Sequence, residues 1–396
     1  MFLELFISKH KSIVFRCLTL SMANNFFRRA GKTILITANV FLAIMLLLGI
    51  YGVKSPIGNH WIFNIINLVS FYFFILNVFF FFFWLFIRPA LTLISLISIA
   101  VCWMPLQHVF QWRLESFNYK KDRDNIRVMS WNVEHFVILE HKTHPEKKTK
   151  MIEIINSFHP DIACFQEMVA SDSTKNAINY IPDFQKKLGI KNYYYAYDKK
   201  LDFDRNHHFG IITFSKFPIV NKKTIVVEKK NYNAIYQYID VVREATDTIR
   251  VFNIHLQSLR FSPTNKMYIE NPSLTDDYSY YQTKSVIKKL KTGFIKRKEQ
   301  IENIKLEVDK SPYPVILCGD FNDLPNSYAY NLIGETLNNA FRSTGSGIGN
   351  TFSGILPTLR IDNIFVDKKF EINQFTRVKK KLSDHYPIVS DVKLNH

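Results

Sequence analysis

The chain has 396 residues, 47% of them hydrophobic, and carries 51 Lys and Arg residues against 34 Asp and Glu residues. This length is enough for more than one domain, and the formal net charge of +17 makes the protein strongly basic. The four cysteines, at positions 17, 102, 164 and 318, are too few and too scattered for a disulfide framework or a cysteine zinc site, which excludes both classes.

Three uncharged, apolar segments lie within the first 106 residues, which contain only one acidic residue. They are Thr33–Val53, Trp61–Ile87 and Ala90–Leu106. A bilayer core requires about 20 apolar residues, with a lower limit near 17, so the first two segments are long enough and the third is at the limit. We expect a multi-pass anchor of two or three spans. The alternatives are a signal peptide for the first segment and a re-entrant or interfacial segment for the third.

Basic residues in the short loops predict the orientation of this anchor. Six Lys or Arg residues precede the first segment, whereas Lys54 and Arg88 stand alone in the two following loops. The N-terminus is therefore expected in the cytoplasm. Three spans, the preferred number, place the rest of the chain on the extracytoplasmic side, whereas two would keep it inside. Met22 is a second plausible start, because the anchor does not need residues 1–21.

The remainder of the chain is polar enough to be soluble. Residues 107–125 are charged and lack apolar periodicity, which is typical of a linker, and residues 126–396 form the predicted soluble domain. Its net charge of about +10 favours anionic partners such as nucleic acid, phospholipid headgroups or phosphorylated small molecules. A charge that serves only solubility is the alternative.

Strand and helix patterns alternate from Ile126 onward. Ile126–Val133 has the period of a strand, and Glu146–Phe158 has apolar residues at helical spacing before Pro160. A strand pattern returns at residues 161–167 and again at 248–257, where Asn253 and His255 share one face. This rhythm predicts an α/β domain.

The most informative segment is PVILCGDFNDLP, at residues 314–325. Its apolar run, Val315–Cys318, predicts a buried strand, and Gly319 removes side-chain bulk where that strand ends. Asp320 and Asn322 then point the same way if the chain stays extended. A carboxylate and an amide projected together suit chemistry on a phosphate, although a simple turn is the alternative.

Five further motifs accompany GDFN: SWNVE at 130–134, FQE at 165–167, NIHLQS at 253–258, RIDNIF at 360–365 and LSDHYP at 382–387. In this order the six motifs resemble the endonuclease/exonuclease/phosphatase superfamily, which includes deoxyribonuclease I, apurinic-site endonucleases, inositol-phosphate phosphatases and neutral sphingomyelinases. The resemblance covers about residues 126–394. It implies a DNase I-like four-layer α/β sandwich of two mixed sheets, in a membrane-anchored, bacterial-type member.

The resemblance also implies the roles of individual residues. It assigns Mg²⁺, with Mn²⁺ as the alternative, to Glu167 and Asp384. It assigns phosphate contacts to Asn132 and Asn253. The implied catalytic residues are His255, Asp320, Asn322, Asp362 and His385. Asp320 would orient or deprotonate the attacking water, and Asp362 would fix the imidazole of His385.

The expected activity is metal-dependent hydrolysis of phosphodiester bonds, of the nuclease type. A phospholipid or sphingomyelin phosphodiesterase, an inositol-phosphate phosphatase and a non-catalytic polyanion-binding membrane protein are the alternatives. Residues 259–285 predict an irregular insertion with Arg260, Lys266 and three tyrosines, at 278, 280 and 281. Such a loop could stack bases, contact a membrane interface or form a simple lid.

Overall fold

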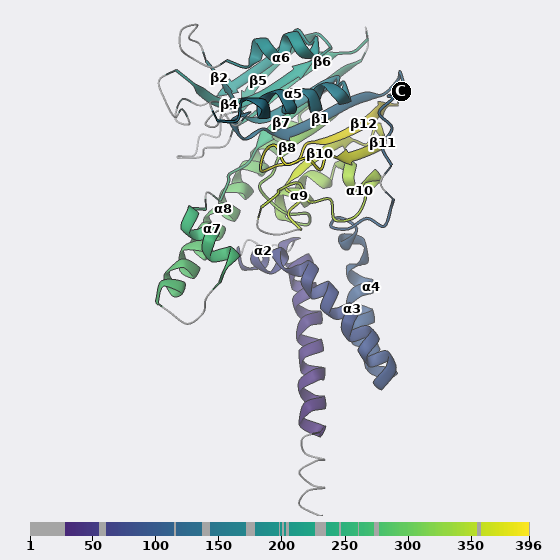
Figure 1. The fold of residues 1–396 in the computed structure, drawn as a ribbon. Helices are drawn as coiled ribbons and strands as arrows, with labels where there is room; N and C mark the ends of the chain where they lie inside the picture. The colour runs from purple at the N-terminus through teal and green to yellow at the C-terminus, as the bar shows by residue number, and fades with distance from the viewer. Residues whose placement is uncertain are drawn as a thin grey trace, which may run out of the picture.

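The computed structural model describes residues 28–54, 61–114, 116–136, 143–171, 179–197, 199, 202, 206–225, 235–244, 247–259, 261–272, 277–354 and 358–395. The N-terminal tail with Met22, and Arg260 of the predicted insertion, lie outside these residues, as does the side chain of Tyr278. The described chain forms a sandwich of two sheets with helices on its outer faces, and a group of apolar helices projects below it (Figure 1).

The apolar part begins with a helix at Arg28–Lys54, which ends in the turn η1 (Gly52–Lys54). The third apolar segment forms η3 (Pro89–Leu91) and α4 (Thr92–Leu106). Three helices are long and apolar enough to cross a membrane, judged by length and composition alone. They are Arg28–Lys54, Ser70–Ile87 and Pro89–Leu106.

The second apolar segment differs from the single span predicted over residues 61–87. It is divided into α2 (Trp61–Leu68) and α3 (Ser70–Ile87). The helix α2 packs against α8 (Asp277–Asp309) of the soluble part, and the Lys291 ammonium lies 5.4 Å from the centre of the Trp61 ring. Hydropathy could not reveal this break, because α2 is as free of charge as the span that follows it.

Both sheets have six strands, and the first is mixed. Its strand order is β11 (Phe370–Arg377), β12 (Ile388–Leu394), β1 (Ile126–Asn132), β2 (Ile162–Ala170), β4 (His208–Ser215) and β3 (Asn192–Tyr197). The strand β1 pairs in parallel with β2 and antiparallel with β12. Every residue of β1 is buried, because the strand lies in the middle of its sheet and both faces are covered.

The second sheet is also mixed. Its strand order is β5 (Ile219–Ile225), β6 (Ile235–Val242), β7 (Thr248–His255), β8 (Val315–Asp320), β10 (Asp362–Asp367) and β9 (Leu337–Asn339). The central pair β7–β8 is parallel, and its neighbours are antiparallel. The two sheets face each other across an apolar interior that includes Val128, Val251, Ile316 and Ile364.

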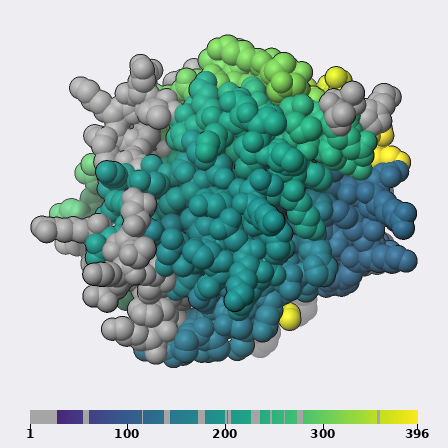
Figure 2. Space-filling model, turned by 90° about the horizontal axis from the view of Figure 1, so that it is seen from above, coloured from purple at the N-terminus to yellow at the C-terminus, as the bar shows by residue number. Residues whose placement is uncertain are grey.

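Helices complete the outer layers. The first sheet is covered by α5 (Pro145–Phe158) and α6 (Ile181–Leu188), and the second by α8 and α9 (Tyr328–Gly334). This arrangement confirms the predicted four-layer sandwich of two mixed sheets. Seen from above, the sandwich hides the apolar helices, which lie on its opposite side (Figure 2).

The insertion expected to be irregular is largely helical, so that prediction was wrong. Residues Pro263–Glu270 form α7, and α8 already begins at Asp277. Ser262 caps α7 by accepting a hydrogen bond from the Asn265 amide, and the Asn265 side chain accepts one from the Ser262 amide in return. Both helices extend away from the sandwich toward the level of the apolar helices (Figure 1).

Candidate active site

Strand pairing brings polar residues from distant parts of the chain to one edge of the sandwich. His255 at the end of β7 and Asp362 at the start of β10 are both register partners of Asp320, the last residue of β8. Asn132 ends β1, in the facing sheet. We call the following residues the polar cluster: Asn132, Glu167, His255, Asp320, Asn322, Asp362, Asp384 and His385.

The amide of Asn132 connects the two sheets. Its Nδ2 donates to Asp320 Oδ2 (3.1 Å) and to Glu167 Oε1 (3.3 Å). His255 Nε2 lies 3.7 Å from Asp320 Oδ2 and 3.8 Å from Glu167 Oε1. This buried nitrogen has no hydrogen-bond partner among the residues that the structure describes, which leaves it available to a ligand.

His385 and Asp362 form a buried pair behind Asp320. His385 Nδ1 lies 2.8 Å from Asp362 Oδ2, and His385 Nε2 faces Asp320 Oδ2 at 3.7 Å. The pair fixes the ring so that Nε2 points toward the centre of the cluster. Asp384 Oδ1 lies 3.9 Å from the same nitrogen and remains 41% exposed.

Asn322 is held beside Asp320 by its backbone and by its side chain. Its amide N–H donates to Asp320 Oδ1 (2.7 Å), and its Nδ2 donates to Asp320 Oδ2 (3.2 Å) and to the carbonyl of Leu256 (3.0 Å). Asp320 therefore accepts hydrogen bonds on both oxygens, which restricts the orientation of its carboxyl group.

Burial and neighbouring charges shift the titration of the cluster. Burial raises the pKa of Asp320 to about 6, although the imidazoles of His385 and His255 oppose this shift. Burial disfavours the charged form of His385, but the carboxylates of Asp362 and Asp320 outweigh it and raise the pKa of His385 well above its ordinary value. For Glu167 burial acts against ionisation, yet three imidazoles lower the pKa of the carboxyl group. At neutral pH the cluster thus holds a protonated His385 beside ionised carboxylates.

Backbone strain concentrates at the same place. Glu167 (φ 53°) and Asn322 (φ 49°) adopt left-handed conformations, and so do Glu134, His135 and Phe136 (φ 44°, 60° and 50°). The register between β2 and β4 shifts between Phe165 and Met168, and Glu167 lies within this irregularity. Its side chain therefore departs from the alternation of the other side chains along β2. Such conformations cost on the order of 1–3 kcal/mol each and are typical of functional sites.

The structure adds two residues to the site that the motifs did not single out. Glu134 Oε2 accepts a hydrogen bond from the Asp384 amide (2.9 Å). His135 Nδ1 lies 3.3 Å from Glu167 Oε2, and its ring packs on Phe209 with centroids 3.9 Å apart. Glu134 stood within the SWNVE motif, but its role depends on the left-handed turn that follows β1, which side-chain alternation does not predict.

Asn253 does not join the cluster. It is fully buried between the sheets, where its Oδ1 accepts from Gln166 Nε2 (2.8 Å) and its Nδ2 donates to the carbonyl of Ile212 (2.9 Å). It does share a strand face with His255, as expected, but that face is turned toward the other sheet until the strand ends. The phosphate contact expected of Asn253 is therefore not supported by its position.

The donor set suits a hard divalent cation. Asp320, Asp362 and His385 offer ligand atoms within 4.8 Å of one another, but a protonated His385 held by Asp362 repels a cation. The more accessible carboxylates of Glu167 and Asp384 provide the oxygen ligands that Mg²⁺ prefers. Burial chiefly raises the pKa of Glu134, and the negative charges of Asp384 and Glu167 act in the same direction.

Comparisons with known structures agree with this fold. An endonuclease/exonuclease/phosphatase from Beutenbergia cavernae has a TM-score of 0.51 at 18% identity, over 69% of this chain and 72% of that one. A family protein from Leptotrichia buccalis has a TM-score of 0.48 at 15% identity, over 68% and 100% of the chains. A D. rerio TDP2 structure, complexed with single-stranded DNA product, has a TM-score of 0.48 at 14% identity, over 69% and 100%. Only the first of these likenesses bears on the fold, and at 18% identity it concerns the fold alone.

Family models divide the sequence into two parts. Residues 32–109 match a domain of unknown function (DUF8431), whereas no curated protein matches the chain. Residues 129–385, more than half of the chain, match the model of the endonuclease/exonuclease/phosphatase family. That family comprises phosphoric ester hydrolases that use divalent metal ions, and the polar cluster lies within the matched residues. The chain belongs to the endonuclease/exonuclease/phosphatase family.

Proposed function

We propose that this protein is a membrane-anchored, metal-dependent phosphodiesterase that acts on nucleic acid. The proposal rests on one observation: Asn132, Glu167, His255, Asp320 and His385, from both sheets, converge with a protonated imidazole opposite buried carboxylates. A structural ion-pair network would have no need of the strained backbone at Glu167 and Asn322, nor of a buried His255 nitrogen that has no hydrogen bond among the described residues.

Hydrolysis replaces one phosphorus–oxygen ester bond with a bond to the oxygen of water. In the proposed reaction Asp320 orients this water and accepts its proton, for which a pKa of about 6 is well matched to neutral pH. Asn132 and Asn322 hold the Asp320 carboxyl group. The leaving alkoxide takes a proton from solvent.

Negative charge develops on the phosphate as the water attacks. His385, protonated and fixed by Asp362, and His255, with its free Nε2, face the region where this charge would appear. A divalent cation held by Glu167 and Asp384 would neutralise part of the phosphate charge and stabilise the leaving oxygen. Mg²⁺ is the proposed ion, with Mn²⁺ as an alternative of similar ligand preference.

A nucleic-acid substrate is supported by charge next to the cluster. A cavity of about 380 Å³ begins two residues beyond His255, at Gln257, and is lined by Lys288, Lys289 and Lys296 of α8. Three lysines that line a cavity starting at Gln257 favour a substrate that carries more than one phosphate.

A lipid-headgroup phosphodiester is the second candidate, and a specific contact favours it. The helix α8 packs on α2, next to the apolar helices, and Lys291 lies over the ring of Trp61. If those helices span a bilayer, α7 and α8 reach toward its surface from the sandwich (Figure 1). Such a position would bring lipid headgroups near the Lys-lined cavity.

We further propose residues 1–106 as an anchor of three membrane spans, residues 107–125 as a linker and residues 126–396 as the catalytic domain. The three apolar helices support this division by their length and composition. The excess of Lys and Arg before the first apolar segment, Thr33–Val53, supports a cytoplasmic N-terminus and an extracytoplasmic catalytic domain.

The test uses the full-length protein, purified in detergent and given single-stranded DNA, plasmid DNA, RNA, sphingomyelin and inositol phosphates, with Mg²⁺ or with a chelator. We expect Mg²⁺-dependent cleavage of nucleic acid. Asp320→Asn and His385→Gln should each reduce the rate by roughly 10³-fold or more while the thermal unfolding midpoint changes little.

The matched control is Asp367→Asn, because Asp367 ends the strand that Asp362 begins. This change should leave the rate unaltered. Turnover of sphingomyelin alone would select the second candidate. Full activity of Asp320→Asn, or full activity of the wild type in chelator, would contradict the proposed mechanism.

A further inference from the structure

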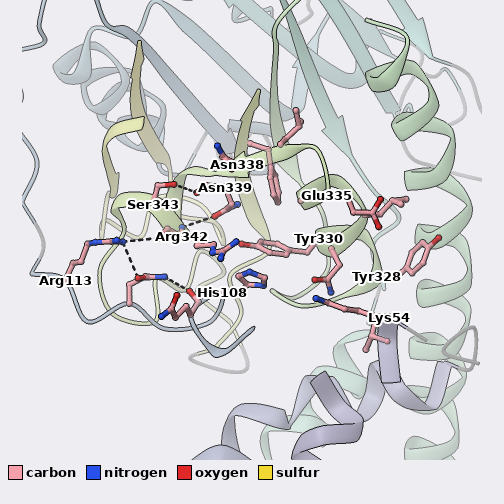
Figure 3. A pocket seen from close by; sticks show the side chains of 18 residues that line it. Lys54, His108, Arg113, Tyr328, Tyr330, Glu335, Asn338, Asn339, Arg342 and Ser343 are labelled. Atoms are coloured by element: carbon pink, nitrogen blue, oxygen red, sulfur yellow. Dashed lines mark hydrogen bonds between the residues drawn. The ribbon is translucent and has the colours of Figure 1, made fainter. Parts of the chain in front are cut away.

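A second cavity, of about 710 Å³, lies where the apolar helices meet the sandwich. Its floor is formed by Val53 and Lys54, at the end of the first apolar helix, and by Gln107 and His108, just after α4. Residues of α9, β9 and α10 (Ala340–Thr344) form the opposite wall (Figure 3). No residue of the polar cluster lines this cavity, so it is separate from the proposed active site.

Positive charge converges on this cavity. It is lined by Lys54, Arg113 and Arg342, against a single carboxylate, Glu335. Lys54 and Arg342 approach the cavity from opposite sides, with His108 between them (Figure 3). Within the part of the chain that the structure describes, neither Lys54 nor Arg342 forms an ion pair, and both residues are exposed, so their charges are accessible to an anion.

The rest of the lining holds this arrangement in place. Arg113 is committed to protein contacts, because its Nη1 donates to Gln111 Oε1 (3.2 Å) and to the backbone carbonyl of Arg342 (2.9 Å). Arg342 itself lies on a short helix capped by Asn339, whose Oδ1 accepts from the Arg342 amide (3.1 Å). The backbone that carries Arg342 is thus fixed at two points, while its guanidinium remains free for a ligand.

His108 lies between the two cations Lys54 and Arg342 and is affected both by burial and by their charge (Figure 3). Burial, and then the charges of Arg342 and Lys54, lower the pKa of His108 to about 4. The imidazole is therefore neutral at physiological pH, where it can donate or accept a hydrogen bond. An anion in the cavity would offset the repulsion that the two cations impose on each other.

We propose that this cavity binds a phosphate group through Lys54 and Arg342. Lys54 is the last residue of one apolar helix and Gln107 follows directly after another, so if those helices span a bilayer the cavity lies at the level of the lipid headgroups. The phosphate can therefore come from an anionic phospholipid or from a soluble phosphate. The binding site goes beyond the proposed hydrolysis and does not require it.

The experiment measures binding to the full-length protein in detergent, with phosphatidylglycerol and inorganic phosphate as separate probes. Native mass spectrometry counts bound lipid, and the thermal unfolding midpoint reports phosphate. We expect the double variant Lys54→Ala/Arg342→Ala to bind its probe at least about 10-fold more weakly, because two charge-assisted contacts are lost. Binding of phosphatidylglycerol alone identifies a lipid as the source, whereas binding of inorganic phosphate identifies a soluble anion.

The matched control removes two lysines that are exposed on α6, far from the cavity, by Lys186→Ala/Lys187→Ala. It should bind as the wild type does. If the double variant folds poorly, the single variants Lys54→Gln and Arg342→Gln should each show an intermediate loss of binding. Hydrolysis rates report whether each variant is folded, since none of these residues belongs to the polar cluster. The proposal is overturned if the wild type binds neither probe, or if the Lys54 and Arg342 variants bind as tightly as the control.

Discussion

Asn132 and Asn253 are both buried asparagines on central strands, yet their amides contact different surroundings. Asn132 lies at a strand end and spans the gap between Asp320 and Glu167. Asn253 lies two residues before a strand end, and its amide is used up by Gln166 and by the carbonyl of Ile212. Distance from the end of the strand therefore separates a residue that belongs to the polar cluster from one that lies in the interior between the sheets.

This contrast gives a prediction for the two asparagines. Asn132→Ala should lower the hydrolysis rate by roughly 10²-fold or more, because the orientation of Asp320 is lost, with little change in stability. Asn253→Ala should instead destabilise the fold by about 1–3 kcal/mol, since Gln166 loses its partner in the interior. Hydrolysis rates and thermal unfolding of both variants provide the measurement. A catalytic loss in Asn253→Ala without destabilisation would contradict the interior role.

At the scale of single residues, the sequence motifs pointed to the polar cluster but not to its neighbours Glu134 and His135. Strand-terminal motifs pointed to Asp320, His255 and Asp362, and the structure brings these residues together because the paired strands end at a common edge. Glu134 and His135 could not be predicted, since their approach to Asp384 and Glu167 depends on left-handed backbone after β1. Asn253 was expected at the phosphate site, yet it lies in the interior. The alternation of side chains along a strand shows which residues share a face, but not which part of the protein covers that face.

At the scale of elements, β7 and β8 approach each other unusually closely beside the site. Gly319 of β8 has φ +146°, and a Cβ added there would lie 2.0 Å from the carbonyl oxygen of Ile254 on β7. The register partner of Asp320 is His255, one residue further along the same pair of strands. The missing side chain at Gly319 thus lets the two catalytic candidates sit side by side.

Gly319→Ala should therefore disrupt the β7–β8 pair. The added methyl group meets backbone that cannot move aside, so we expect a loss of roughly 3 kcal/mol or more in the free energy of unfolding, or no folded protein. Gly334→Ala in α9 is the matched control, because its added Cβ would come no closer than 3.9 Å to Phe365. Equal thermal unfolding midpoints for the two variants would refute the close-approach argument.

Apolar periodicity predicted much of the order of strands and helices, but it did not predict the break between α2 and α3 or the helices over residues 263–285. The break between α2 and α3 lies inside an uncharged run, so only the packing of α2 against α8 reveals it. Residues 263–270 and the first turns of α8 have weak apolar periodicity, and their helices depend on a capping box and on mutual packing. The pattern of apolar residues within a segment does not show which contacts that segment makes with a distant part of the chain.

At the scale of the whole molecule, residues 107–125 do more than connect the apolar helices to the sandwich. Gln111 exchanges backbone hydrogen bonds with Gly347 (2.9 and 2.8 Å), and the buried Arg360 donates to the carbonyl of His108. Asn326 donates to the carbonyl of Pro105 (2.9 Å) and its Oδ1 lies 2.6 Å from His108 Nδ1. These contacts fix the sandwich on the apolar helices.

The neutral His108 at this junction predicts a loss of stability in acid. Its pKa is about 4 in the folded protein and about 6.5 when unfolded, so the unfolded chain binds more protons between these values. Stability from this group is present above pH 6.5 and falls as the pH drops toward 4, by on the order of 1–2 kcal/mol at pH 5. Arg342, Lys54 and Arg360 are the charged groups that face it.

The test compares thermal unfolding at pH 7.5 and pH 5. His108→Asn keeps an N–H group near the position of Nδ1 but cannot be protonated, so this variant should lose less stability in acid than the wild type does. Identical acid losses in both proteins would show that His108 does not contribute.

Topology is the second prediction at this scale. Cys102, Cys164 and Cys318 are free and buried, so once Cys17, which lies outside the described residues, is replaced by Ser, a cysteine introduced at the exposed Lys186 can be labelled selectively. In intact cells a membrane-impermeant maleimide should label Lys186→Cys, since three spans place α6 outside the cytoplasm. Labelling only after permeabilisation would place the domain in the cytoplasm instead.

The place of β12 beside β1 has a consequence for biosynthesis. Val128 of β1 pairs with Ser390 of β12, so the middle of the first sheet joins segments that leave the ribosome far apart in time. At 5–20 residues per second, translation of the intervening chain takes roughly 15–50 s. Throughout that interval β1 presents an open, apolar edge. The nascent chain must therefore be shielded until residues 388–394 emerge, by which time the apolar helices have long been available for insertion.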